Sequence, residues 1–188
     1  KVFKETNNCS PKNNYALAKL DCEHYLTEEC KANNIDLIIL RSCPFIDLKS
    51  KTKIAFLGNL AKNFRLSVEF NKANVNSRSF LTIKNLFLIL EGILVYLENS
   101  DSKIYKIFNI GDKYPISTNT AVKIIAEKYS AKPVIIRVPK IFELITSKIP
   151  LIRRFYENLI SNHAIDISSV EQTLRIKLLE THESLLND

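Results

Sequence analysis

Tyr15 and Lys19 stand one helical turn apart near the start of the chain, in the stretch SPKNNYALAKLDCEHYL. Residues with this spacing lie on one face of a helix, so the Tyr15 hydroxyl and the Lys19 ammonium can reach the same site. A phenol is a poor base at neutral pH because its reference pKa is about 10, and a fixed cation nearby favours the phenolate. The pair therefore has the chemistry of an assisted proton acceptor. In a lysine-rich chain the same spacing also fits an ordinary solvated helix face.

The elements that would position this pair alternate between helix and strand, which predicts an α/β fold. Residues 14–33 run without Gly or Pro, which predicts a helix. Four residues recur there near helical spacing, namely Leu17, Leu20, His24 and Tyr25. The run IDLIILR at 35–41 follows directly and is typical of a buried parallel strand, because it is apolar and β-branched.

The rest of the chain continues the alternation. Further helices are expected at 52–64, 84–97, 140–149 and 151–160, with a last one beginning at 168. Further strands are expected at 78–83, 103–111 and 132–139. Ser117 or Thr118 can cap another helix. Its apolar face would consist of Ala121, Val122, Ile125 and Ala126.

The composition limits the possible classes of function. Of the 188 residues, 46% are apolar and 25% are charged, which is typical of a globular protein rather than a disordered one. The net charge of +7 comes from lysines spread along the chain, whereas a nucleic-acid footprint is clustered, so we expect no nucleic-acid partner. The most apolar run, at 80–97, is interrupted by Lys84 and Glu91. We therefore expect no membrane span and a cytoplasmic protein.

The cysteines and histidines do not form a recognisable metal site. Neither C-x-x-C nor zinc-type Cys/His spacing occurs among Cys9, Cys22, Cys30 and Cys43, which favours free thiols in a reducing compartment. The three histidines, His24, His163 and His182, show no spacing that suggests a metal or a triad. We expect no metal and surface positions for the histidines.

Several segments together resemble, in order, the motifs of the extended short-chain dehydrogenases/reductases, the NAD-dependent epimerase/dehydratase family. SPKNNYALAKLDCE resembles the segment P-x-x-x-Y-x-x-S-K-x-x-x-E, and IDLIILRSCPF the strand and L-R-P-x-x-V-Y-G turn beside the nicotinamide. NSRSFLTIKNL resembles the R-S-F-V-x-V-x-N-L segment, whose arginine binds a diphosphate. IFNIGDKYPISTNTAVKIIAE and AIDISSVEQTL resemble the later F-N-V-G and D-x-S-K segments.

The resemblance implies the C-terminal part of a Rossmann-type doubly wound parallel sheet, with a small, mostly helical substrate-binding subdomain. Residues 1–48 would be the distal part of the NAD-binding domain and 49–188 the substrate-binding region, with 84–110 returning to the sheet. Tyr15 and Lys19 would be the catalytic pair and would also contact NAD. Cys43 and Pro44 would bind the cofactor, and Arg78 would bind the nucleotide-diphosphate sugar.

The activity implied is that of a UDP-sugar 4-epimerase acting through a transient 4-keto sugar. A nucleotide-sugar 4,6-dehydratase is the alternative, and a non-catalytic remnant or partner-dependent subunit is an alternative from another class. The chain has no glycine before Gly58 and does not begin with Met. The family's glycine-rich phosphate-binding loop lies upstream of the catalytic tyrosine. We therefore expect a fragment without the N-terminal strands, inactive alone, from a parent that would form a homodimer.

Overall fold

The structure is a computed structural model that describes residues 2–46, 52–70, 75–129, 132–138 and 150–186. It is an α/β protein of helices and short parallel strands, as the alternating pattern predicts. The helices are α1 (Asn14–Ala32), α2 (Lys53–Phe64), α3 (Ile83–Glu98), α4 (Thr118–Lys128), α6 (Pro150–Ile160), α7 (Ser168–Leu174) and α8 (Thr181–Leu186). The strands are β1 (Val2–Phe3), β2 (Leu37–Ser42), β3 (Leu66–Phe70), β4 (Tyr105–Ile110), β5 (Val134–Val138) and β6 (Ala164–Ile165).

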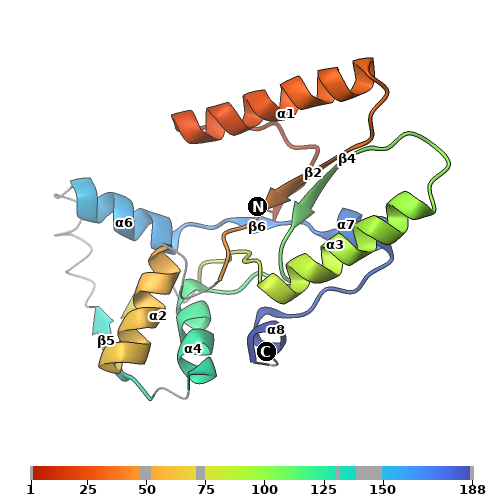
Figure 1. The fold of residues 1–188 in the computed structure, drawn as a ribbon. Coiled ribbons are helices and arrows are strands. Elements are labelled where there is room, and N and C mark those ends of the chain that lie inside the picture. Colours follow the sequence, from red (N-terminus) through yellow and green to blue (C-terminus); the bar gives the residue numbers. More distant parts are fainter. Residues whose placement is uncertain (1, 47–51, 71–74, 130–131, 139–149, 187–188) are drawn as a thin grey trace.

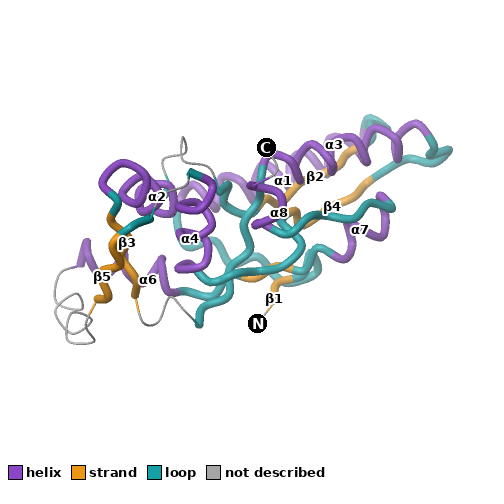
Figure 2. Tube along the Cα trace, turned by 90° about the horizontal axis from the view of Figure 1, so that it is seen from below, coloured by secondary structure: helices purple, strands orange, loops and turns teal. Residues whose placement is uncertain are grey.

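The strands form parallel pairs, β1 with β6, β2 with β4 and β3 with β5. In the β2–β4 pair Leu37 lies opposite Tyr105 and Ser42 lies opposite Ile110, so the two strands end together. Figures 1 and 2 show α1, β2, β4, α3 and α7 toward one side of the molecule, and α2, β3, α4, β5 and α6 toward the other. The chain therefore passes between the two sides several times.

Each side has its own hydrophobic core. One core gathers β4, α3 and α7 through Phe108, Ile89, Val170 and their neighbours. The other is built mainly from α2 and α4, with Leu57 and Ile125 among its buried residues. In the described part of the chain, none of the helices combines the length and the apolar character that a bilayer crossing requires.

A buried carboxylate joins the loop after β4 to the first turns of α3 and α8. Asp112 Oδ1 accepts hydrogen bonds from the Thr82 backbone N–H and hydroxyl, both at 2.9 Å, and from the Asn85 amide at 2.7 Å. Its Oδ2 accepts one from the Thr181 hydroxyl at 2.7 Å. Burial raises the pKa of Asp112, and these donors oppose that rise by favouring the carboxylate. The network fixes the loop that follows the carboxyl end of β4.

Three helices, α1, α2 and α4, begin at a side-chain cap. The Asn13, Thr52 and Ser117 side chains each accept a backbone N–H three residues on, at 2.8, 3.1 and 3.0 Å respectively. The bounds of the helices confirm those expected at 14–33, 52–64, 84–97 and 151–160 within a residue or so, and the cap at Ser117 is also confirmed.

The face of α1 that packs against the protein differs from the face that the helical spacing of its apolar residues suggested. Its partly buried residues form the stripe Ala16, Leu20, Glu23, Thr27 and Cys30, and none of its residues is fully buried. Leu17, His24 and Tyr25, which recur near helical spacing, are exposed. The helix therefore lies on β2 along a mixed stripe, in which Glu23 and Thr27 are polar.

The expected strand at 78–83 is wrong. Arg78 makes single bridges with Ile116 and His163, and Leu81 makes one with Phe45, so no partner runs beside this segment for a ladder. Thr82 then becomes the residue before α3. The short strands β1, β3 and β6 and the helix α8 are not anticipated by the sequence patterns, and the expected helix at 140–149 lies outside the described residues.

Candidate active site

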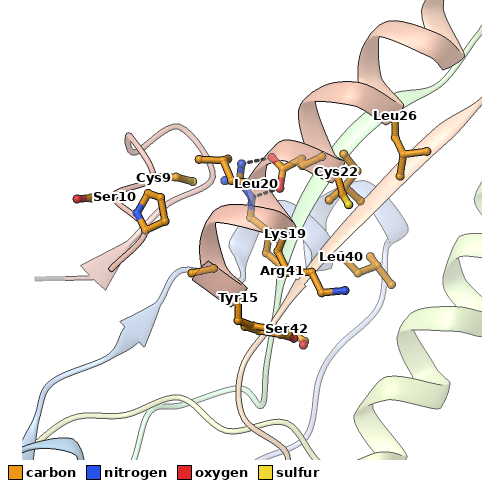
Figure 3. Close-up of a pocket in the computed structure, with 14 residues that line it drawn as sticks. Cys9, Ser10, Tyr15, Lys19, Leu20, Cys22, Leu26, Leu40, Arg41 and Ser42 are labelled. Carbon is orange, nitrogen blue, oxygen red and sulfur yellow. Dashed lines mark hydrogen bonds and ion pairs between the residues drawn. The ribbon is translucent and has the colours of Figure 1, made fainter. Parts of the chain in front are cut away.

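Tyr15 and Lys19 line a cavity of about 750 Å³ between α1, the segment before it and the second half of β2. A volume in this range is typical of small-molecule sites. The Lys19 ammonium lies 5.7 Å from the centre of the Tyr15 ring. Figure 3 shows both side chains extending from α1 toward the strand that carries Arg41 and Ser42. Tyr15 is 74% exposed, so a ligand in the cavity can reach this residue from solvent.

An ion pair joins α1 to β2 at the back of this cavity. The Arg41 guanidinium donates from Nε to one Glu23 oxygen at 3.1 Å and from Nη2 to the other, and its Nη1 donates to the Glu5 carbonyl at 3.0 Å. The hydrogen bond to Glu23 raises the pKa of Arg41. Sequence reasoning did not single out this pair. Glu23 is the last residue of the motif SPKNNYALAKLDCE, which also contains Tyr15, and this place in the motif could have marked it as a candidate.

A second cavity, of about 430 Å³, adjoins the first at Arg41 and Ser42. Its other described lining residues are Cys43, Pro44, Arg78, Asn109, His163 and Ile165. The two cavities therefore follow one another along the carboxyl ends of β2 and β4, where ligands bind in open parallel sheets. Tyr15 and Lys19 lie in the first cavity, and Cys43, Pro44 and Arg78 lie in the second.

Arg78 is partly buried and incompletely hydrogen-bonded. Its Nη1 donates to the Asn158 carbonyl and, at 3.2 Å, to the Ser161 hydroxyl. Its Nε is buried and has no hydrogen-bond partner. Burial lowers the pKa of Arg78 because it disfavours the charged form. A buried donor without a partner is costly, so an anion that reached Arg78 would be bound favourably.

Cys43 and Pro44 differ in exposure although they are neighbours. Pro44 is exposed, whereas Cys43 is buried with the core around β4 and α3. Burial, with a further contribution from Asp112, raises the pKa of the Cys43 thiol to about 12. The thiol is therefore a neutral packing group at physiological pH, and the surface that this turn offers to a ligand is mainly that of Pro44 and the backbone.

His163 lies at the rim of the second cavity, beside Arg78. The backbones of the two residues form a parallel bridge, with the Ser79 N–H donating to the His163 carbonyl at 2.9 Å. The surrounding protein partly removes the imidazole from water, and this partial desolvation, followed by the charges of Arg78 and Lys12, lowers the pKa of His163 although the residue is exposed overall. Its exposure agrees with the expected surface position, but the bridge to a distant segment has no sequence signal.

The glycines of the chain do not form a site for the pyrophosphate of a dinucleotide. Its three glycines are Gly58 in α2, Gly92 in α3 and Gly111 after β4. Gly92 and Gly111 adjoin the core, with Gly92 against Leu174 and Ile176 and Gly111 against the Cys43 sulfur. A glycine-rich turn leading into a helix, which would cradle a pyrophosphate, does not occur within these 188 residues. The chain's own residues therefore do not fit the pyrophosphate of a dinucleotide.

Comparisons with known proteins identify the fold. No protein-family model and no curated protein sequence matches the chain. Among solved structures it is similar to the UDP-glucose 4-epimerase of Thermotoga maritima with UDP-glucose, at 18% identity and a TM-score of 0.67, over 99% of this chain and 56% of that one. It is also similar to the UDP-N-acetylglucosamine 4-epimerase of Methanobrevibacter ruminantium in complex with UDP-N-acetylmuramic acid. The identity is 20% and the TM-score 0.68, over 98% of this chain and 55% of that one. The dTDP-glucose 4,6-dehydratase of Bacillus anthracis in complex with NAD matches with 11% identity and a TM-score of 0.67, over 100% of this chain and 54% of that one.

These similarities show that the chain has the fold of part of a Rossmann-like nucleotide-sugar epimerase or dehydratase. The chain spans about half the length of the solved structures that it matches. The expected α/β fold with parallel strands is thereby confirmed.

Proposed function

We propose that this chain is the substrate-binding and proton-transfer part of an NAD-dependent enzyme that acts on a nucleotide-diphosphate sugar, with 4-epimerisation as its reaction. One observation carries the proposal: the cavity of Tyr15 and Lys19 adjoins the cavity of Arg78 through Arg41 and Ser42. The proposed proton acceptor and the proposed anion-binding cation thus lie in two adjoining cavities. A sugar linked to a diphosphate has the corresponding two parts.

Each proposed role follows from the chemistry of the residue. The Tyr15 hydroxyl accepts the proton of a sugar hydroxyl, and the Lys19 ammonium favours the phenolate that does so. Arg78 neutralises the diphosphate through charge-assisted hydrogen bonds. NAD, when bound, supplies the hydride acceptor. Residues 1–48 and 84–110 would belong with the sheet that carries the cofactor, and the rest of 49–188 with the sugar nucleotide.

The names of the similar structures support the substrate class. Two are UDP-sugar 4-epimerases in complex with UDP-sugars, and one is a dTDP-glucose dehydratase in complex with NAD. The dehydratase is the second candidate because its structure matches as well as the epimerases do. The two reactions give different products, a C4 epimer or a 4-keto-6-deoxy sugar, so product analysis separates them.

Replacement of Tyr15 by Phe tests the proton acceptor. We would join this chain to the part of the Thermotoga maritima epimerase that it does not match, and assay UDP-glucose turnover with NAD. Tyr15→Phe keeps the ring and removes the acceptor, so turnover should fall by about 10² or more. Tyr25→Phe is the matched control, because Tyr25 lies on the same helix, is 62% exposed and does not line the cavity.

Loss of turnover in Tyr15→Phe alone would support the proposal. A folded, NAD-loaded hybrid that converts no nucleotide sugar would favour a non-catalytic role for this chain. Equal turnover in the two variants would show that Tyr15 is not the proton acceptor.

A further inference from the structure

The second cavity has the character of an anion site. None of its described lining residues is Asp or Glu, and three of them, Arg41, Arg78 and His163, can carry positive charge. Arg41 is already paired with Glu23, whereas Arg78 and His163 have no carboxylate partner among the described residues. The buried Nε of Arg78 lacks a hydrogen-bond acceptor. An acceptor brought by a ligand would satisfy it.

The backbone places the His163 side chain next to that of Arg78. Arg78 and His163 lie opposite one another in a parallel bridge, and paired residues in a bridge direct their side chains to the same face. Two hydrogen bonds of 2.9 Å, Ser79 N–H to the His163 carbonyl and His163 N–H to the Ser77 carbonyl, fix this pairing. Both side chains line the same cavity. The pairing is between segments far apart in the sequence, so only the fold creates it.

We propose that His163 and Arg78 together bind the phosphoryl anion of the ligand, with His163 as a second hydrogen-bond donor beside the arginine. The proposal rests on the proposed function in taking that anion to be the diphosphate of a nucleotide sugar. A neutral imidazole offers one N–H donor, whereas a protonated one offers two and carries a charge. His163 therefore binds an anion best in its protonated form.

The charges around His163 give the direction of the effect. In the free protein its pKa lies below the ordinary value of 6.5, because of partial desolvation, Arg78 and Lys12. The charged groups that act on His163 are Arg78 and Lys12. Arg41 lines the same cavity and is paired with Glu23. Asp166, three residues along the chain, is paired with Lys4. A bound anion offsets the repulsion from the cations and favours imidazolium. Binding should therefore raise the pKa of His163, and affinity should fall as pH rises through that raised value.

NMR titration of the histidine side chains tests the proposal on the 188-residue chain. Only three imidazoles contribute signals, and His163→Gln identifies one of them. The pH titration is run on the protein alone and on the protein with one of three ligands: UDP-glucose, inorganic pyrophosphate, or uridine as an uncharged control. The phosphates of UDP-glucose stay ionised throughout the titration. We expect both anions to raise the pKa of His163 and to leave His24 and His182 unchanged, and uridine to have no effect.

Two variants connect the shift to binding. Arg78→Ala should weaken UDP-glucose binding about tenfold or more, and His163→Gln about threefold to tenfold, as measured by calorimetry. Arg137→Ala is the matched control, because Arg137 is an exposed arginine on β5 that does not line the cavity. It should bind UDP-glucose normally. His163→Gln should also remove the pH dependence of binding.

The outcomes separate this inference from the proposed function. A shift of His163 with pyrophosphate but not with UDP-glucose supports the anion site and contradicts the sugar-nucleotide substrate. A shift with both, together with normal turnover in Tyr15→Phe, supports the anion site and contradicts the catalytic role of Tyr15. Equal shifts of all three histidines, or an unchanged His163 at saturating anion, would overturn the inference.

Discussion

Cys43 shows how much the surroundings of a residue change its chemistry. Cys9 and Cys22 are exposed at the wall of the first cavity, whereas Cys43 is buried behind the second. A thiolate loses its hydration when it is buried, so burial favours the neutral thiol and raises its pKa to about 12 from 9.0. The reactive form of a cysteine is the thiolate. The same residue type is thus available for reaction at the surface and inert in the core.

Thiol labelling should separate these cysteines. Under native, mildly alkaline conditions iodoacetamide should modify Cys9 and Cys22 readily and Cys43 only after unfolding, as followed by peptide mass spectrometry. The raised pKa also lowers stability in alkali. Between pH 9.0 and about 12 the unfolded chain binds fewer protons at Cys43 than the folded chain, so stability falls as pH rises through this range. Cys43 labelling as fast as that of Cys9 in the folded protein would contradict the burial.

At the scale of the element, α1 is held by few contacts. It has no fully buried residue, and the stripe that faces β2 includes Glu23 and Thr27. Hydrophobic burial therefore contributes little to its position. The specific connection to β2 is the pair of hydrogen bonds from the Arg41 guanidinium to the Glu23 carboxylate. The connection to β4 is a hydrogen bond of 3.3 Å from the Tyr105 hydroxyl to the Cys30 carbonyl. Because Glu23 lies one turn beyond Lys19, the ion pair also sets which face of α1 is turned to the cavity.

Replacing Glu23 by Gln should loosen α1. The change removes the charge opposite a partly buried Arg41, and hydrogen bonds to charged groups contribute about 1.5–3 kcal/mol, so we expect a loss of stability in or somewhat below that range. Hydrogen exchange should accelerate at the amides of α1 and remain unchanged in α2 and α4. Glu28→Gln, at an exposed position of α1, is the control and should have no effect. Unchanged exchange in α1 of Glu23→Gln would show that other contacts hold the helix.

At the scale of the whole molecule, the site lies where the two sides meet. The first cavity belongs to α1 and β2, while the second takes Arg78 from the segment before α3 and His163 from the segment after α6. The Asp112 network fixes the loop after β4, and Gly111 in that loop packs against the Cys43 sulfur. The cavities are therefore shaped by several segments that are distant in sequence. A cradle for a pyrophosphate at a glycine-rich turn is not part of this arrangement in the described residues.

The 188-residue chain by itself should bind a nucleotide sugar better than it binds NAD. Arg78 and His163 supply an anion site, whereas the glycine-rich turn that positions a dinucleotide does not occur in the sequence. Calorimetry should give saturable binding of UDP-glucose and none of NAD at micromolar concentrations. Arg78→Ala should abolish the difference by weakening UDP-glucose binding. Micromolar NAD binding by the isolated chain would mean that it holds the cofactor by residues other than those of a glycine-rich turn.

The sequence by itself determined the local elements. Helical periodicity and capping residues predicted α1, α2, α3, α4 and α6, and apolar β-branched runs predicted β2, β4 and β5. These patterns arise from the geometry of the backbone, which repeats over a few residues and is independent of the rest of the chain. The placement of Tyr15 and Lys19 on one helix face is local for the same reason. The strand β3 was not among the expected strands, although its sequence, LSVEF, alternates apolar and polar residues as a half-buried strand does.

Only the tertiary structure decided which distant residues meet. The expected strand at 78–83 became a set of single bridges because its neighbours come from three different segments, which no local pattern encodes. The same bridges place Arg78 beside His163, and packing of α1 on β2 places Glu23 against Arg41. Contacts of this kind depend on how the elements pack, and the free energy of packing is a property of the assembled surfaces. The sequence therefore identified Tyr15, Lys19 and Arg78 as candidate site residues. Only the fold shows that the cavity of Tyr15 and Lys19 adjoins the cavity of Arg78 at Arg41 and Ser42.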